Sequence, residues 1–333
     1  MMHQQASPVR VGIAGATGYS GAELVRLLAR HPAVHLTLAT SSGTSAVRRL
    51  PALAKIWDEP VRPLDPQALI DGCDVVMMAL PEKVSATLGA DLVAAGRRVI
   101  DLSGAFRVRD DVGRARWYPD TTVLPDGTLY ALPERSRAAL PNATLASCPG
   151  CYPTAALLAL LPLIDAGLLD GDVVIDAKSG VSGAGKSPTD RTHFSENHGS
   201  VSAYGVFGHR HGAEMEQELG RGVTFVPHLV PLNRGILETI YGRLKPGTTA
   251  AAVAAALTSA YADAPFVRLW PEALPEIKHV AFTNFCDIGW RVDEATGRIV
   301  LVSCLDNLLK GAASQAIQNL NLMLGLDERT GLL

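Results

Sequence analysis

The stretch that most constrains the fold lies near the start of the chain, where a strand, a glycine turn and a helix are predicted in succession. Val9–Ala14 is a short apolar run typical of a buried strand, and Ala22–Arg30 carries leucines at helical spacing. The turn between them reads Gly15-Ala16-Thr17-Gly18-Tyr19-Ser20-Gly21. Glycines at this place allow a pyrophosphate to approach the helix N-terminus closely, as in dinucleotide-binding domains. An ordinary glycine turn stays open as the alternative.

The same alternation of strand and helix continues through the first half of the chain. Val84–Ala95 is a predicted helix. Further strands are predicted at Val34–Ala39, Asp74–Leu80 and Arg97–Leu102. This order favours an α/β fold with a doubly wound, Rossmann-type parallel sheet. Leu80 and Pro81 stand at a strand's carboxyl end, where such sheets bind ligands, so we expect them to contact the cofactor.

The residues after the second strand bear on the choice of dinucleotide. A domain that binds the ribose of NAD usually has an acidic residue about 20 positions past the glycines. Between Glu23 and Asp58 this chain has no Asp or Glu, and Ser41, Ser42, Arg48 and Arg49 follow the strand instead. Hydroxyl and guanidinium groups suit a 2′-phosphate, so the pattern favours NADP. The alternative is a serine-rich surface loop with solvated arginines.

The second half has a different pattern, which predicts an α+β arrangement with a largely antiparallel sheet. Its candidate strands are Val173–Ala177, Val223–Val226, Leu237–Leu244, Val280–Ile288 and Ile299–Leu305. A last helix is predicted over Asn307–Leu324, packing back on the first domain. We therefore expect an NADP-binding Rossmann domain from 1–150 with 307–333, and a catalytic and dimerisation domain from 151–306.

Cys151 is the strongest candidate for chemistry. It follows Pro149-Gly150 and precedes a predicted helix, with Pro153 in the first turn. Unpaired N–H groups and the positive end of the helix dipole favour a thiolate, which is the nucleophilic form. A cysteine that merely packs in the core is the alternative. Its place after a turn, rather than on an apolar face, favours the catalytic interpretation.

His209 and His211 are the candidates for proton transfer, because an imidazole exchanges a proton near neutral pH. Two histidines two positions apart also suggest a metal site, but further ligands are not evident nearby, so we expect no metal. A purely structural histidine is the third possibility. The spacing does not decide which imidazole faces the cysteine.

Two loops are candidates for binding anions. Arg107 follows a predicted strand and can hold an anionic substrate through a forked contact, or it can be an ordinary surface arginine. Lys178–Lys186 is rich in glycine and serine and resembles a phosphate cradle without the Walker spacing. A flexible connection is the alternative for this second loop.

Composition limits the kinds of binding partner and the cellular compartment that we expect for this chain. A net charge of −3 gives no basic surface for nucleic acid or membrane. The first eight residues lack the apolar region of a signal peptide, and the apolar run at 155–164 is too short to span a bilayer. Five cysteines, an odd number, argue against a complete set of disulfides. We expect a cytoplasmic protein.

Several motifs together resemble one family, the N-acetyl-gamma-glutamyl-phosphate reductases, over essentially the whole chain. The motifs are the Gly12–Gly21 stretch, Pro149-Gly150-Cys151-Tyr152-Pro153-Thr154, His209-Arg210-His211, Pro227-His228-Leu229-Val230-Pro231, Thr283–Gly289 and Asp306–Ala312. The resemblance implies the reduction of N-acetyl-glutamyl 5-phosphate by NADPH to N-acetyl-glutamate 5-semialdehyde and inorganic phosphate, in arginine biosynthesis. It also implies a homodimer or homotetramer.

The resemblance also implies roles for single residues. Cys151 matches the nucleophile, His209 or His211 the acid/base, and Arg107 an arginine that binds the anionic end of the substrate. Positions similar to the family's substrate and cofactor contacts are Ser182 for the substrate and Gly15, Thr17, Gly18, Tyr19, Ser20, Ser179, Gly180, Gly183 and Asn307 for the cofactor.

The chain departs from the family's pattern at two places. Ser41-Ser42 stands where Ser-Arg is common, so the 2′-phosphate contact is left to Arg48 or Arg49 or is absent. Cys148 stands where Asn is common and puts a second thiol near the site. Two other functions remain as alternatives: a semialdehyde dehydrogenase for another acyl phosphate, and an NADP-sensing protein without activity.

Overall fold

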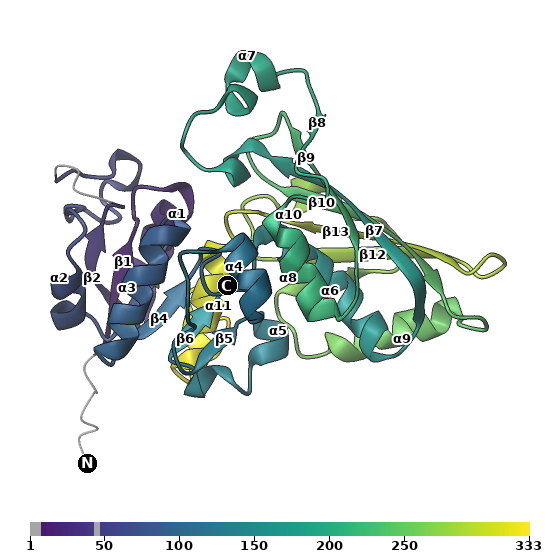
Figure 1. The fold of residues 1–333 in the computed structure, drawn as a ribbon, viewed down its shortest axis with the longest axis horizontal. Helices are drawn as coiled ribbons and strands as arrows, with labels where there is room; N and C mark the ends of the chain where they lie inside the picture. The colour runs from purple at the N-terminus through teal and green to yellow at the C-terminus, as the bar shows by residue number, and fades with distance from the viewer. Residues whose placement is uncertain (1–7, 43–46) are drawn as a thin grey trace. The chain divides into compact units, whose positions relative to one another are not determined.

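The computed structural model describes residues 8–42 and 47–333. The chain divides into two compact units, Met1–Cys148 with Ala313–Leu333 and Pro149–Ala312, called unit 1 and unit 2 below (Figure 1). The part of the serine-rich loop at 43–46 lies outside the described residues. The final helix, α11 (Ala313–Met323), belongs to unit 1, where it packs against α1 (Tyr19–Leu28).

Unit 1 is built on a sheet of six strands in the order β2-β1-β3-β4-β6-β5, in which every pair is parallel. The strands are β1 (Val9–Ala14), β2 (Val34–Thr40), β3 (Val75–Met78), β4 (Arg98–Asp101), β5 (Thr128–Tyr130) and β6 (Leu145–Ser147). The remaining helices of unit 1 are α2 (Pro66–Gly72), α3 (Glu82–Ala94), α4 (Asp111–Trp117) and α5 (Pro133–Ser136). The predicted Rossmann-type parallel sheet is confirmed.

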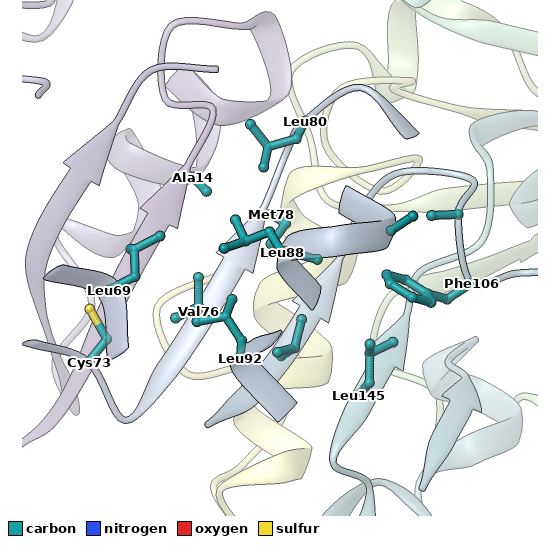
Figure 2. Packing of buried hydrophobic residues seen from close by; sticks show 13 residues of the cluster. Ala14, Leu69, Cys73, Val76, Met78, Leu80, Leu88, Leu92, Phe106 and Leu145 are labelled. Carbon is teal, nitrogen blue, oxygen red and sulfur yellow. The ribbon is translucent and has the colours of Figure 1, made fainter. Parts of the chain in front are cut away.

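The core of unit 1 forms where α3 packs on the sheet. Figure 2 shows Val76 and Met78 of β3 beside Leu88 and Leu92 of α3, with Phe106 close by. All of these side chains are buried, and each large one contributes about 2 kcal/mol through removal from water. Gly89 leaves room for the Phe106 ring, since a Cβ there would lie 2.7 Å from Phe106 Cζ. The core therefore fixes the sheet whose carboxyl edge carries the glycine turn.

Unit 2 contains a mixed sheet of seven strands in the order β11-β12-β13-β10-β7-β9-β8. Two neighbouring pairs, β11–β12 and β7–β9, are parallel and the other four are antiparallel. The strands are β7 (Leu169–Gly180), β8 (Ser202–Ala203), β9 (Thr224–Val230), β10 (Ile236–Leu244), β11 (Val267–Trp270), β12 (Cys286–Asp293) and β13 (Arg298–Leu305). The expectation of a largely antiparallel sheet is confirmed.

Helix α6 (Cys151–Asp165) is the central helix of unit 2. Its residues from Tyr152 to Leu163 are all buried, which explains why its sequence is apolar on every side. It packs against β10, β13, α8 (Arg210–Leu219) and α9 (Ala250–Ala260). Two shorter helices, α7 (Phe194–Asn197) and α10 (Ile277–Val280), complete the unit. Burial of α6 fixes the position of its first residue, Cys151.

Two predicted elements are wrong in their extent. The strand expected over Val280–Ile288 begins only at Cys286, after a turn in which Thr283 donates its hydroxyl to the Val280 carbonyl at 2.7 Å. The helix expected from Asn307 begins only at Ala313. There the Asp306 carboxylate accepts the N–H groups of Leu308 and Leu309 and holds a turn instead.

Candidate active site

The candidate nucleophile stands at the very start of a helix. Cys151 is the first residue of α6, and Gly150 before it is the N-cap, with extended backbone and no side chain to cap the helix. The first turn of α6 carries no acidic residue. The free N–H groups and the dipole there favour a thiolate over a thiol. Cys151 is half-buried, whereas the other four cysteines are buried.

His211 lies against the turn that carries the cysteine. A Cβ at Gly150 would come within 2.5 Å of His211 Nε2, so the imidazole packs directly on the glycine backbone. Glu214, one turn further along α8, has its Oε1 3.8 Å from the same nitrogen. This arrangement gives an imidazole beside the turn that carries the cysteine and a carboxylate beside the imidazole, which suits a proton-transfer group.

Glu214 also holds the cysteine turn in place. Its side chain is fully buried, and its Oε2 accepts the Gly150 N–H at 3.0 Å. One carboxylate therefore links the N-cap of α6 to the imidazole on α8. Sequence reasoning missed this residue. The available signal was the spacing of three between His211 and Glu214, which puts both on one helix face.

His209 has a different environment. It is the N-cap of α8, and its Nδ1 accepts the backbone N–H of His211 at 3.1 Å. Its ring packs edge-on against Tyr152 and Phe225, at centroid distances of 5.9 and 5.5 Å. Burial, together with the positive charge of Arg210, lowers the pKa of His209 to about 4. The geometry therefore favours His211 over His209 as the acid/base.

Ser182 and Asn307 form a hydrogen-bonded pair near the cysteine. Asn307 donates from Nδ2 to Ser182 Oγ at 2.9 Å and accepts the Gly235 N–H on Oδ1 at 2.7 Å. Between Asn307 and Cys151 stands Gly311, whose missing Cβ would lie 2.8 Å from Cys151 Cβ and 2.9 Å from Asn307 Cα. Close approach of these groups therefore requires glycine at 311.

The loop after β7 brings further predicted cofactor residues to the same place. A Cβ at Gly183 would lie 2.9 Å from Ser179 Oγ and 3.7 Å from Asn307 Nδ2. Gly180 packs on the backbone of Arg234, with 2.7 Å from its missing Cβ to the amide nitrogen. The structure therefore gathers Ser179, Gly180, Ser182, Gly183 and Asn307 within unit 2; their roles remain predictions.

The glycine turn of unit 1 fits a pyrophosphate. Gly15 has φ +95°, and a Cβ there would lie 2.2 Å from the Ala79 carbonyl oxygen. Gly18 is the N-cap of α1 and offers no side chain to the first N–H groups of the helix. Backbone donors at a helix start, without a capping side chain, suit a phosphate. Thr17, Tyr19 and Ser20 border this turn.

The predicted contacts to the 2′-phosphate differ in accessibility. Ser41 is buried, with its N–H donated to the Arg62 carbonyl at 2.8 Å, whereas Ser42 is exposed. Arg48 and Arg49 are also exposed, and the Arg49 guanidinium donates to the Asp58 carbonyl. Ser42 and the two arginines therefore remain accessible to a ligand.

Other predicted ligand contacts lie at the carboxyl edge of the parallel sheet. Pro81 is exposed at the N-cap of α3, and Leu80 before it is buried. Leu80 packs on the glycine turn, with its Cδ2 3.3 Å from the missing Cβ of Gly15. Both stay predicted cofactor contacts.

Arg107 is buried. Its Nε donates to the Cys148 carbonyl at 2.8 Å, and a terminal nitrogen donates to the Leu102 carbonyl at 2.7 Å. Two donors are thus engaged by the backbone at the ends of β4 and β6. The contact of Arg107 with the substrate therefore stays a prediction.

Cys148 is inert as a nucleophile. Burial raises the pKa of its thiol to about 12, and its sulfur accepts from Asn319 Nδ2 at 3.5 Å. A thiol in this environment stays protonated near neutral pH. The second thiol predicted near the site therefore packs in unit 1.

Within the ranges 8–42 and 47–333, no group of three or more His, Cys, Asp or Glu is arranged to hold a metal ion. The helices of the same ranges include none that is both long and apolar enough to cross a bilayer.

Comparison with known proteins identifies both units. Residues 10–143 match the family model described as "Semialdehyde dehydrogenase, NAD binding domain" and residues 151–307 the model "Semialdehyde dehydrogenase, dimerisation domain". Among solved structures, aspartate semialdehyde dehydrogenase II of Vibrio cholerae is similar with a TM-score of 0.73 at 19% identity, covering 96% of this chain and 99% of that one. The enzyme of Candida albicans, solved with NADP, has a TM-score of 0.72 at 16% identity and covers 96% and 99%. At these identities, the structures show a shared fold.

Sequence relatives give the family. N-acetyl-gamma-glutamyl-phosphate reductase of Desulforudis audaxviator is 46% identical over 338 residues, covering 97% of this chain and 98% of the relative. The reductase of Symbiobacterium thermophilum is also 46% identical, over 340 residues, covering 98% and 97%. The resemblance seen in the motifs is thus confirmed over nearly the full length. The chain belongs to the N-acetyl-gamma-glutamyl-phosphate reductase family of the semialdehyde dehydrogenases.

Proposed function

We propose that this chain reduces N-acetyl-glutamyl 5-phosphate to N-acetyl-glutamate 5-semialdehyde and inorganic phosphate, using NADPH, as a cytoplasmic step of arginine biosynthesis. The observation that carries the proposal is the packing of His211 on Gly150, directly before Cys151 at the N-terminus of α6. A nucleophile beside an acid/base is what an acyl-transfer step requires. The names of the relatives supply the substrate.

Cys151 performs the first step. Its thiolate attacks the acyl carbon of the substrate and forms a sulfur–carbon bond. The bond from that carbon to the phosphate oxygen breaks, and phosphate leaves with the electron pair. The product is a thioester on Cys151, so that one difficult step is divided into two easier ones.

His211 and the start of α6 serve the second step. Bound NADPH supplies the hydride that reduces the thioester carbonyl. The carbonyl oxygen then gains charge, and the N–H groups in the first turn of α6 and a protonated His211 stabilise it. Collapse of the thiohemiacetal breaks the sulfur–carbon bond, releases the aldehyde and restores the Cys151 thiolate. Glu214 keeps His211 oriented throughout through its carboxylate.

Unit 1 contributes the proposed NADP site. The uncapped start of α1 takes the pyrophosphate, and the exposed Ser42, Arg48 and Arg49 take the 2′-phosphate. The absence of Asp and Glu between Glu23 and Asp58 supports NADP over NAD. We expect kcat/KM to be higher with NADPH than with NADH, and equal values would contradict this assignment.

Unit 2 is the proposed catalytic and self-associating part. The match of residues 151–307 to a dimerisation domain supports a homodimer or a homotetramer. In the proposed division of labour, residues 1–150 with 307–333 bind NADP, and residues 151–306 carry the chemistry and the subunit contacts.

Replacement of the nucleophile tests the proposal. Cys151→Ala should abolish turnover, measured as phosphate release and NADPH oxidation, because no thioester forms. NADPH binding, followed by nucleotide fluorescence, should be unchanged. Cys148→Ala is the matched control, since that buried thiol has no proposed role in the chemistry and its variant should retain turnover. Near-normal activity of Cys151→Ala would refute the assignment.

A further inference from the structure

Residues 185–201, called the arm below, join two parts of the candidate active site within unit 2. The arm begins after Ser182 and ends before Tyr204 and His209. It is held by its own contacts, such as the reciprocal bonds of Thr189 and Thr192 and the rings of Phe194 and His198, 5.0 Å apart. Figure 1 shows α7, near its middle, standing off from the sheet beside β8. The arm is thus a separate structure attached at both ends to the site.

Arg191 is a cation of the arm that stacks on one of the site's aromatic residues. Its guanidinium carbon lies 5.1 Å from the centre of the Tyr204 ring. Arg191 borders a cavity of about 240 Å³, together with Asp190, Glu196, Asn197, Ser200 and Ser202. Among the residues described in 8–42 and 47–333, none forms a hydrogen bond or ion pair with this guanidinium. The Tyr204 ring orients the guanidinium through a cation–π contact.

Tyr204 connects Arg191 to the catalytic groups. Its hydroxyl lies 3.3 Å from that of Tyr152, the residue after Cys151, and its ring lies 5.5 Å from that of His209. The Tyr204 N–H donates to the Pro227 carbonyl at 3.0 Å, which ties this end of the arm to β9. Arg191 is therefore separated from the histidine pair by one aromatic ring.

The substrate of the proposed reaction needs a cation near the catalytic groups. Its reacting carbonyl is at one end of a short aliphatic chain, and the other end bears a carboxylate and a secondary amide. Once the carbonyl is at Cys151, the carboxylate must be bound a few bonds away. Arg107 has two of its donors engaged by backbone carbonyls, whereas Arg191 has its planar donors available.

We propose that Arg191 binds the α-carboxylate of the substrate, in a subsite formed by the arm, and thereby selects N-acylated α-amino acid acyl phosphates. This inference rests on the proposed function. Asn197, Ser200 and Ser202 offer donors and acceptors for the acetamide group. Asp190 and Glu196 border the same cavity and repel an anion, so its binding there depends on the contact with Arg191. Stacking on Tyr204 pre-orients the guanidinium and lowers the entropy lost on binding.

The main test compares the KM and kcat of the variants Arg191→Gln and Arg191→Lys with those of the wild type. A hydrogen-bonded ion pair made equally in the ground and transition states affects binding, so KM should rise about 10- to 100-fold while kcat changes little. Arg191→Lys should recover part of the loss, because it keeps the charge but not the fork. The matched control is Arg243→Gln, whose guanidinium bonds the Thr296 carbonyl in the same unit. The control should leave KM unchanged.

A substrate without the carboxylate makes the test specific. With 4-acetamidobutyryl phosphate, the wild type should lose kcat/KM about as much as Arg191→Gln loses with the natural substrate. When Arg191→Gln is assayed with 4-acetamidobutyryl phosphate, kcat/KM should fall little further than with either change alone. The two changes remove the two partners of one contact. A wild-type KM in Arg191→Gln, or losses that simply add, would overturn the inference.

A binding measurement separates this inference from the proposed function. N-acetyl-glutamate should protect Cys151 from iodoacetamide, and half-protection should need about 10- to 100-fold more of it in Arg191→Gln. This readout requires no turnover. Absence of turnover in the wild type would refute the proposed function, whereas equal protection of wild type and variant would refute the role of Arg191.

Discussion

Titration can distinguish His209 from His211, because the structure gives the two imidazoles different tasks. His209 Nδ1 is engaged in capping α8, and its pKa is lowered from 6.5 to about 4 by burial first and by Arg210 second. His209→Asn keeps a short acceptor at the N-cap and removes the titrating group. We expect this variant to keep most of its reductase activity and His211→Asn to lose about 10²- to 10⁴-fold, as for loss of a general acid/base.

The size of the effect on stability follows from the two pKa values. In the unfolded chain His209 takes up a proton near pH 6.5, and in the folded chain only near pH 4. Between these values the unfolded state binds more protons, so the free energy of unfolding falls as the pH falls from 6.5 to 4. The full loss is about 3 kcal/mol, and about 2 kcal/mol of it is present at pH 5. Above pH 7 this contribution is absent.

Urea unfolding of wild type and His209→Asn at pH 7.5 and pH 5.0 measures this difference. The wild type should lose about 2 kcal/mol more than the variant between the two conditions. Comparison of the two proteins cancels the contribution of every other titrating group, and the capping contribution cancels because it is the same at both pH values. An equal loss in both proteins would refute the reasoning. So would an NMR titration in which His209 takes up its proton near pH 6.5.

Two further substitutions test the close approaches seen at glycines. Gly150→Ala puts a methyl group 2.5 Å from His211 Nε2. Displacement of the imidazole by about 1 Å should lower kcat about 100-fold with little change in the thermal midpoint of unfolding. An unchanged kcat would contradict the placement of His211. Gly21→Ala puts a methyl group 2.1 Å from the Gly15 carbonyl oxygen, so the glycine turn must open. The Kd for NADPH should then rise at least about 10-fold, as measured by fluorescence. A wild-type Kd in that variant would show that the turn does not hold the nucleotide.

The parallel sheet of unit 1 could be predicted well because its signals are local. Val9–Ala14 is apolar, stands between Pro8 and Gly15, and forms β1 with the predicted bounds. β5 was not predicted, since a strand of three residues is too short to show a periodic pattern. Strand pairing at this edge is decided by the neighbouring β6, which lies far enough along the chain to leave no local trace.

The error at Val280–Ile288 has a long-range cause. The run has the apolar and β-branched residues of a strand, but Phe282 has φ +64°, a value that strands do not adopt. Its N–H donates to the Asp306 carboxylate at 2.7 Å, and the ring stacks with the Arg234 guanidinium at 4.5 Å. Both partners are distant in sequence, so the local pattern could not reveal the turn.

The candidate site was partly predictable for a similar reason. Cys151 could be predicted from the Pro-Gly turn before it and the helix that follows it. The choice between the two histidines depends on which imidazole caps α8 and which packs on Gly150. Neither contact can be read from the sequence without the folded structure. Glu214 looks like any helical glutamate until its burial is known. Arg191 lies in a polar loop without periodicity, and only its stacking on Tyr204 in the folded chain suggests a role for it.

The attachment of the arm at both ends has a consequence for how such enzymes can diverge. Its bends are braced by local bonds such as those between Thr189 and Thr192, so insertions or exchanges there need not disturb the buried helix α6 or the strands around it. Selection can therefore act on recognition while the reacting thiol is inherited unchanged. A library randomised over 185–201 is the natural place to look for variants that accept other acyl phosphates.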